Sequence, residues 1–271
     1  MSNQTPEPGS DAIITPDVPP GALLRFISDL HLGHERSEVK SVAALAPIIS
    51  GADVLVVAGD LAETRNCPWR QRALELREDF RALCARMGVR LIELSGNHDP
   101  DVRPLLARFY GGEVVAMHGH ALFKEVAPWS WEYLRNRDAC RRLIAQYPKL
   151  ESDLTERLEL SRAVSLATTP IMRRDGIRNR WLRGFMHCFW PPLRPWNIIR
   201  AWTTCGKRAR EFAERFLPDC RILITGHFHR SGHWNYGRLN IYNTGACFRH
   251  ARPYLVDVRN GRVISYRRAT Q

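Results

Sequence analysis

Short, mostly apolar runs recur along the chain, and each is followed by polar residues that can bind a metal or move a proton. Runs of four to six residues are too short for most helices and are typical of strands buried on both faces of a sheet. They cover residues 23–27, 54–58, 89–94, 114–117 and 221–225. The residues that follow, directly or one position on, are Ser-Asp-Leu-His, Gly-Asp, Gly-Asn-His-Asp, His-Gly-His and Gly-His-Phe-His. The pattern therefore predicts strand ends that carry reactive side chains.

Apolar positions three or four residues apart predict helices between these strands. The most regular helix begins near Pro68 and stops at Gly88, a residue type that suits a helix C-terminus. Other helices are expected over residues 35–49, 103–110, 151–166 and 199–216, the last with an apolar side formed by Ile199, Trp202, Ala209, Phe212 and Phe216. Further strands are expected at residues 239–242, 254–257 and 263–266, with the last two joined by an Asn-Gly hairpin turn. Strands that alternate with helices indicate an α/β protein.

Composition bounds the class of protein. The 271 residues are 44% hydrophobic, which is enough for a sizeable core. Residues 1–21 are polar and rich in proline, and we expect a disordered tail there. The seven cysteines are scattered and form no Cys-x-x-Cys pair, which disfavours a disulfide framework and a zinc ribbon. Because the chain shows no apolar signal core and no run of eighteen apolar residues, we expect a cytoplasmic protein without a membrane span.

The net charge of +12 is concentrated in one segment. Residues 133–216 contain 18 Lys or Arg and eight Asp or Glu, and they include a dense run of Trp, Phe and Pro between positions 181 and 196. We expect this segment to be a helical cap inserted between two core parts, residues 22–132 and 217–271. Local positive charge favours a phosphate-rich partner, although a solvated basic surface is the plain alternative.

The strand ends supply carboxylate, imidazole and amide groups but no thiolate. This mixture suits Mn²⁺, our first expectation, or Fe²⁺, Zn²⁺ or Co²⁺, and it disfavours a structural zinc. The candidate ligands are Asp29, His31, Asp60, Asn97, His118, His227 and His229. Any one of them alone could be a turn residue. Seven together are too many for one ion, but they fit two ions that share a carboxylate and hold a hydroxide for attack on phosphorus.

In order and spacing, these motifs resemble those of the calcineurin-like metallophosphoesterases, over residues 24–125 and 221–268. The resemblance implies a four-layer α-β-β-α sandwich that hydrolyses a phosphoester. It implies one ion held by Asp29, His31 and His229, a second ion held by Asn97, His118 and His227, and Asp60 as the bridge. It also implies that His98 protonates the leaving oxygen or stabilises charge in the transition state.

Two positions near the motifs leave alternatives open. Family members commonly carry a second Asp three residues after Gly-Asp, whereas this chain has Glu63, followed by Thr64 and Arg65. Orientation of His98 by a carboxylate is therefore an open question. In the His-Gly-His motif either histidine could be the ligand, and both the strand end and the family pattern favour His118 over His120.

The cap is the expected source of substrate specificity, because the core motifs define only the reaction. The candidate substrate-binding residues there are Arg173, Arg174, Arg178 and Arg180. A helical insertion before the last motif is similar to that of bacterial UDP-2,3-diacylglucosamine pyrophosphatases. This similarity implies a lipid-linked or nucleotide-linked diester or diphosphate, and peripheral contact with an anionic inner membrane. The alternative is a nuclease or cyclic-nucleotide phosphodiesterase that uses the arginines for phosphates.

Overall fold

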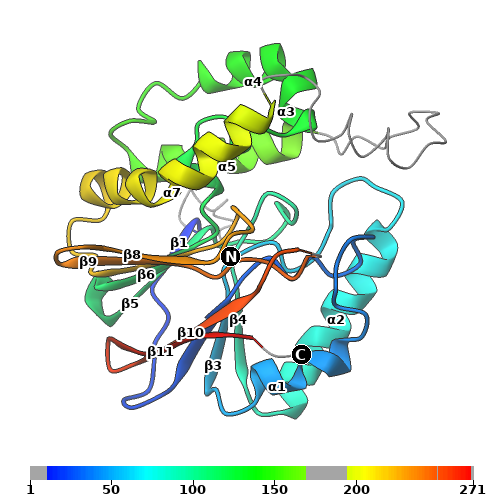
Figure 1. Cartoon of the computed structure of the whole chain (residues 1–271), viewed down its shortest axis with the longest axis vertical. Helices are drawn as coiled ribbons and strands as arrows, with labels where there is room; N and C mark the ends of the chain where they lie inside the picture. The colour runs from blue at the N-terminus through cyan, green and yellow to red at the C-terminus, as the bar shows by residue number, and fades with distance from the viewer. Residues whose placement is uncertain (1–10, 169–193, 249, 270–271) are drawn as a thin grey trace, which may run out of the picture.

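The computed structural model describes residues 11–168, 194–248 and 250–269. Two β-sheets lie face to face, and helices cover the outer side of each sheet (Figure 1). One sheet has five strands in the order β11-β10-β2-β3-β4, and the other has six in the order β1-β5-β6-β7-β9-β8. This arrangement confirms the predicted α/β class and the four-layer α-β-β-α sandwich.

The helices and strands are mostly short. The strands are β1 (Ile13–Ile14), β2 (Leu24–Ile27), β3 (Val54–Val57), β4 (Arg90–Glu93), β5 (Leu106–Phe109), β6 (Val114–Met117), β7 (Ile222–Thr225), β8 (Gly232–Tyr236), β9 (Leu239–Asn243), β10 (Tyr254–Arg259) and β11 (Arg262–Arg268). The α-helices are α1 (Ala46–Ile49), α2 (Arg70–Arg86), α3 (Trp131–Arg135), α4 (Arg137–Ile144), α5 (Leu154–Ala167) and α7 (Arg194–Phe216). Short 3₁₀ helices are η1 (Val42–Leu45), η2 (Tyr110–Gly112) and η3 (His120–Leu122).

The core between the sheets is built from alternate residues of fully buried strands. In β2, Phe26 packs between the sheets and Ile27 packs against the helices, because successive side chains of a strand face opposite ways. Phe26 meets Phe109 of β5 edge to face, with ring centroids 5.6 Å apart. Each such burial contributes roughly 1.5–3 kcal/mol. The apolar runs of the sequence thus correspond to strands that are covered on both faces.

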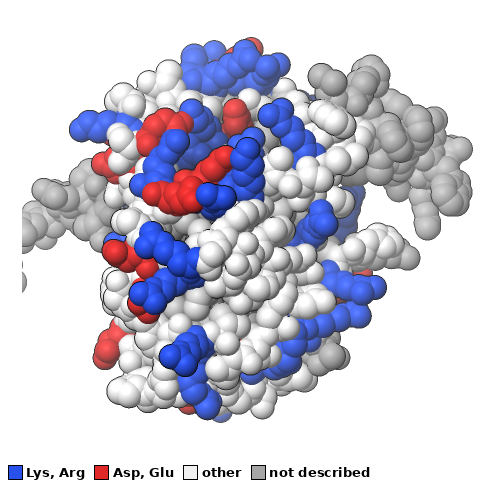
Figure 2. Space-filling view, turned by 60° about the vertical axis from the view of Figure 1, so that its left-hand side comes forward, with Lys and Arg blue, Asp and Glu red and all other residues white. Residues whose placement is uncertain are grey.

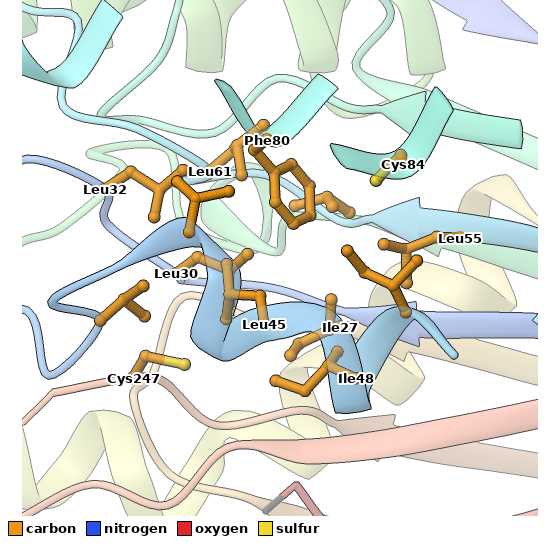
Figure 3. Packing of buried hydrophobic residues seen from close by; sticks show 14 of the residues in the cluster. Ile27, Leu30, Leu32, Leu45, Ile48, Leu55, Leu61, Phe80, Cys84 and Cys247 are labelled. Atoms are coloured by element: carbon orange, nitrogen blue, oxygen red, sulfur yellow. The ribbon is translucent and has the colours of Figure 1, made fainter. Parts of the chain in front are cut away.

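A separate apolar cluster fills each outer interface. On the outer face of the five-stranded sheet, η1, α1 and α2 pack against β3, with Leu45 and Phe80 in one cluster with Leu55 (Figure 3). Over the six-stranded sheet, α5 and α7 pack through Leu158 and Phe212 (Figure 1). Helices α3 and α4 form a smaller cluster with α5. Two helices of the basic middle segment therefore complete the sandwich, and its description as a separate insertion at residues 133–216 stays a proposal.

The prediction of a helix over residues 103–110 is wrong. Residues Leu106–Phe109 form β5, which pairs antiparallel with β6 and parallel with β1. Pro104 and Gly111 confine this segment to a few residues, and so short a helix is unstable, whereas a strand gains a full ladder of sheet hydrogen bonds. The expected disordered tail is also wrong for residues 11–21, because Ala12 is buried and β1 belongs to the sheet.

Two other segments differ from the prediction. The helix expected over residues 35–49 begins only at Val42, as η1 followed by α1. Before it, Ser37 bridges to Phe248, and the Glu38 amide donates a hydrogen bond to the Cys247 carbonyl. Strand β8 was not predicted because its sequence, Gly-His-Trp-Asn-Tyr, lacks an apolar run. Among the described strands it lies at the sheet edge and pairs with β9 alone.

The apolar side expected for helix α7 is confirmed at Ala209, Phe212 and Phe216, which pack inward, but not at Ile199 and Trp202. Its buried residues are Ala201, Cys205, Gly206, Ala209, Phe212 and Ala213. In contrast, Ile199 and Trp202 are 51% and 43% exposed. Small residues let α7 approach the sheet, and a Cβ at Gly206 would lie 2.7 Å from the Trp234 ring of β8. No helix in the described ranges has the length and apolar character needed to cross a bilayer.

Candidate metal centre

The structure brings all seven candidate ligands to one edge of the two sheets. Strands β2, β3 and β4 run parallel, as do β6 and β7, so the loops after each set leave from the same end. The loops after β2, β3, β4, β6 and β7 carry, in that order, Asp29 and His31, then Asp60, Asn97, His118, and finally His227 and His229. The recurring strand-and-ligand pattern therefore has a simple geometric cause.

Left-handed backbone turns point these side chains over the strand ends. Five of the seven have φ between 48° and 74°, namely Asp29, His31, Asp60, His227 and His229. This region costs a non-glycine residue roughly 1 kcal/mol or more. The loops are held by backbone hydrogen bonds, since the Asp29 amide donates to the Gly59 carbonyl at 3.1 Å and the His31 amide donates to the Asp60 carbonyl at 2.9 Å.

Two glycines of the motifs are needed because the loops approach each other closely. Gly59 has a φ of +84°, and a Cβ there would lie 2.6 Å from the His118 ring. A Cβ at Gly226 would collide with Ser28 and Asp29. A side chain at either position would push the candidate ligands apart, which explains why glycine precedes them.

The first group of donors consists of Asp29, His31, Asp60 and His229, with one possible ligand atom of each within 4.8 Å of the others. His229 Nε2 is 3.3 Å from Asp29 Oδ1 and 3.2 Å from His31 Nε2. His31 Nε2 is 3.7 Å from both Asp29 Oδ1 and Asp60 Oδ2. Two carboxylates and two imidazoles thus face one small volume, a donor set that suits a divalent transition metal.

The second group consists of Asp60, Asn97, His118 and His227. His118 Nε2 lies 3.2 Å from Asp60 Oδ2 and 3.2 Å from Asn97 Oδ1. His118 Nδ1–H donates to the Ala58 carbonyl at 3.0 Å, which leaves the Nε2 lone pair available. His227 Nε2–H donates to the Val126 carbonyl at 3.0 Å, which leaves its Nδ1 available. The backbone therefore selects the tautomer of each histidine.

Asp60 joins the two groups. Its Oδ1 accepts a hydrogen bond from the His98 amide at 2.8 Å, whereas its buried Oδ2 has no hydrogen-bond partner among the described residues. That Oδ2 faces His118 on one side and His31 on the other. An unsatisfied buried carboxylate oxygen is costly, and a cation on each side would satisfy it. The residues therefore fit a pair of divalent ions.

The charges of the cluster are strongly coupled. Burial alone would raise the pKa of Asp29 and of Asp60, but neighbouring histidines, chiefly His118, hold both pKa values below the ordinary range. Burial alone would lower the pKa of His118, but Asp60 and Asp29 raise it to about 9. Burial lowers the pKa of His31 to about 4. A cation that binds at Nε2 of His118 must therefore displace a proton.

The sequence matches the calcineurin-like phosphoesterase family over residues 24–231. The chain belongs to this family. It is therefore a metal-dependent phosphoester hydrolase, of a family that uses a dimetal centre. No curated protein matches the sequence.

Several solved structures are similar to this calcineurin-like phosphoesterase. A dimetal phosphatase from Danio rerio has 10% identity and a TM-score of 0.41, with 89% of this chain and 94% of that chain covered. A predicted phosphoesterase from Streptococcus pneumoniae has 12% identity and a TM-score of 0.36, with 90% and 86% covered. Vps29 from Entamoeba histolytica, complexed with Zn²⁺, has 14% identity and a TM-score of 0.37, with 91% and 98% covered. Values this low say nothing about the substrate of this chain.

Glu63, the departure from the family pattern, contacts His98. Its Oε2 lies 2.5 Å from His98 Nδ1, and its Oε1 accepts a hydrogen bond from Arg65 Nε at 2.8 Å. The Glu63 side chain is only 1% exposed. Burial and Arg65 lower the pKa of His98, but Glu63 and Asp60 outweigh them and bring it above the ordinary value. A longer carboxylate can therefore still orient this imidazole.

His120, the alternative to His118, lies beside the donor groups. Its ring centroid is 5.3 Å from that of His118 and 6.3 Å from that of His227. Neither ring nitrogen has a hydrogen-bond partner in the described part of the chain. Burial and the neighbouring His118 hold the pKa of His120 well below its ordinary value. His118 Nε2, in contrast, is 3.2 Å from both Asp60 Oδ2 and Asn97 Oδ1, and this geometry favours His118 as the ligand.

Aromatic side chains that were not predicted from the sequence lie beside the first group. Phe248 stacks on His31, with ring centroids 4.2 Å apart and planes at 11°. The ring centroid of His34 is 5.1 Å from that of Phe248 and 5.4 Å from that of Trp69. Phe248 follows β9, whose end meets the same sheet edge as the ligand loops, and that position was an available signal.

A pocket of about 140 Å³ opens over the candidate centre. Its lining includes Asp60, His98, Arg65, Trp129 and Glu132. The four predicted substrate-binding arginines, Arg173, Arg174, Arg178 and Arg180, lie outside the described residues.

Proposed function

We propose that this calcineurin-like phosphoesterase hydrolyses a phosphodiester or diphosphate bond of a lipid-linked or nucleotide-linked substrate, using two Mn²⁺ ions. The single observation that best supports two ions is the buried Oδ2 of Asp60, which accepts no hydrogen bond from the described residues and lies between the two donor groups, 3.2 Å from His118 Nε2 and 3.7 Å from His31 Nε2. One ion is held by Asp29, His31 and His229, the other by Asn97, His118 and His227, and Asp60 bridges them. Fe²⁺, Zn²⁺ and Co²⁺ suit the same donors.

Two bound divalent ions would supply a deprotonated water and neutralise charge on the phosphoryl group. His98 is the proposed catalytic acid. Glu63 holds its Nδ1, so the other ring nitrogen, 4.0 Å from Asp60 Oδ2, is left to carry a proton toward the pocket. Glu63 and Asp60 raise the pKa of His98 above its ordinary value and so favour the protonated imidazole, which can donate this proton to the leaving oxygen.

The helical layer next to the centre supports an amphiphilic substrate. Trp196, Ile199 and Trp202 of α7 are 64%, 51% and 43% exposed, and they are spaced to share one side of the helix. Trp202 Nε1 donates a hydrogen bond to the Phe228 carbonyl at 3.0 Å, and Phe228 lies between His227 and His229 in the chain. An exposed apolar surface thus adjoins the loop of two candidate ligands. It agrees with a UDP-diacylglucosamine pyrophosphatase-like activity at an anionic membrane surface on the cytoplasmic side.

A nuclease or cyclic-nucleotide phosphodiesterase is the second candidate. The basic excess of residues 133–216 favours it, because clustered Lys and Arg bind phosphate backbones and exposed tryptophans can stack on bases. The two candidates differ in their response to detergent and salt. Activity on a lipid substrate should rise in mixed micelles, whereas cleavage of an oligonucleotide should not, and it should weaken steeply with salt.

The deciding experiment is a turnover screen of the Mn²⁺-loaded protein on UDP-linked lipids, cyclic nucleotides, single-stranded DNA and a small chromogenic diester. The key variant changes the proposed substrate-binding residues Arg173, Arg174, Arg178 and Arg180 to Gln. A matched control changes to Gln four exposed arginines that lie outside residues 133–216, namely Arg72, Arg86, Arg259 and Arg262.

We expect the first quadruple variant to lose turnover of the natural substrate while it keeps cleavage of the chromogenic diester, and the control to keep both. Equal losses on both substrates would contradict a role of these arginines in specificity. Absence of hydrolysis of every diester and diphosphate by the metal-loaded protein would refute the proposed reaction.

A further inference from the structure

A cavity of about 530 Å³ is lined by residues of α7, α5 and the loop at residues 122–128, and the same loop also lines the catalytic pocket. Glu125 lines both, so the cavity and the catalytic pocket share this loop. In Figure 2, basic and acidic side chains gather over the helical layer of the molecule. The volume is in the range of sites for small organic ligands.

The cavity has more positive than negative groups. Its lining contains five Lys or Arg side chains and three Glu side chains. One carboxylate, Glu151, is shared by Lys124 and Arg215, with Arg157 4.0 Å away. Taken over the whole lining, the five cations and three carboxylates leave an excess of two positive charges, and an anionic ligand would balance it.

Two arginines at this cavity are placed for an anion. Arg157 is only 7% exposed, and its Nε donates to the Ala121 carbonyl at 2.7 Å. Arg208 stacks over Phe123, with the guanidinium carbon 4.4 Å from the ring centroid. The buried Nε of Arg208 has no hydrogen-bond partner among the residues that the structure describes. A rigid guanidinium with an unused donor suits the oxygen atoms of a phosphate group.

The same loop reaches the metal centre. Phe123, under Arg208, packs against Trp129 with centroids 5.2 Å apart, and Trp129 lies 5.5 Å from His227. The loop also provides the Val126 carbonyl that accepts from His227 Nε2. A ligand in the cavity would therefore press on the loop that orients one of the candidate metal ligands.

We propose that this cavity is a separate binding site for the phosphate monoester group of a small molecule, with Arg208, Arg157 and Arg215 as the groups that bind it. The apolar floor that Phe123 and Phe212 provide would hold the organic part of the ligand. The proposal does not depend on which bond the catalytic pocket cleaves. The phosphate could belong to a soluble metabolite or to a lipid headgroup.

The test uses the full-length, metal-loaded protein and compares Arg208→Gln with Arg210→Gln. The control is closely matched, because Arg210 lies on the same helix and also stacks on an aromatic ring, that of Tyr236, but it is outside the cavity. Inorganic phosphate is titrated at constant ionic strength, and the change in Tm is recorded. The same series in an Asp60→Asn background, which should hold fewer than two ions, shows how much of the response comes from phosphate at the metal centre.

We expect Arg208→Gln to weaken phosphate binding about tenfold or more, because it removes a charge-assisted hydrogen bond, and Arg210→Gln to leave it unchanged. If Arg208→Gln fails to fold, Arg215→Gln serves as the second cavity variant.

Flotation with phosphatidylcholine vesicles, with and without phosphatidic acid, distinguishes a lipid headgroup from a soluble metabolite as the source of the phosphate group. Vesicle binding that the cavity variants remove indicates a lipid headgroup, and phosphate binding without vesicle binding indicates a soluble ligand. Identical phosphate responses in the cavity variants, the control and the unmodified protein would overturn the proposal.

Discussion

The Glu63 carboxylate provides a sharp test of how this site works. Glu63→Gln keeps the size of the side chain but removes its charge. In the protein this charge lies 2.5 Å from His98 Nδ1 and 2.8 Å from Arg65 Nε, with only 1% of the side chain exposed. The substitution therefore leaves His98 beside a cation that no longer has its counter-ion.

The size of the effect follows from these contacts. A hydrogen bond to a charged group is worth about 1.5–3 kcal/mol, so its loss in the transition state slows kcat by about 10- to 100-fold. The pKa of His98 falls, because Glu63 raises it and Arg65 lowers it. Removing one partner of a buried ion pair also lowers the free energy of unfolding, by roughly 3 kcal/mol.

The assay is the pH dependence of kcat for a chromogenic diester, with metal content measured in parallel. If protonated His98 is the acid, activity declines as the pH rises through its pKa. That decline should therefore begin at a lower pH in Glu63→Gln, while the protein still binds two ions. The control, Glu93→Gln, removes the partner of Arg81, an Arg–Glu pair 2.6 Å apart that joins β4 to α2 and does not touch the centre.

Glu63→Asp, which restores the residue that the family commonly carries, should keep the original pH profile. An unchanged kcat and an unchanged pH profile in Glu63→Gln would refute the role assigned to Glu63. A loss of metal in Glu63→Gln would instead show that Glu63 acts by positioning the metal-binding side chains.

Three further predictions concern the metal centre. Asp60→Asn should abolish hydrolysis and reduce the metal content below two ions, because the bridging charge is lost; two ions at full rate would rule out the bridge. His98→Ala should keep both ions but slow turnover by roughly 10² to 10⁴, as single-turnover kinetics and metal analysis would show. Since the pKa of His118 is raised to about 9, metal affinity should fall about tenfold per pH unit below that value, and binding at pH 7.5 should release a proton, measurable by calorimetry in buffers of different ionisation enthalpy. Affinity independent of pH between 7 and 9 would contradict this proton displacement.

Local sequence determined the strands and the donors at their ends. Residues such as Val56 and Ile224 lie in apolar runs that can be satisfied only by burial on both faces, and the polar residue after each run must then emerge at a sheet edge. The ordered motifs also identified the reaction class, because carboxylate, imidazole and amide groups in that order have few other uses.

The tertiary structure decided which of these local tendencies prevailed. The spacing of residues 103–110 suits a helix, but pairing with β6 made Leu106–Phe109 a strand. In α7, Gly206 allows the helix to approach Trp234 closely, and hydrophobicity alone placed Ile199 and Trp202 on the inward face although both are exposed. The placement of Glu63 against His98, and of Phe248 on His31, depends on loops that are far apart in sequence. Such contacts form only when distant segments pack, and a local pattern carries no information about them.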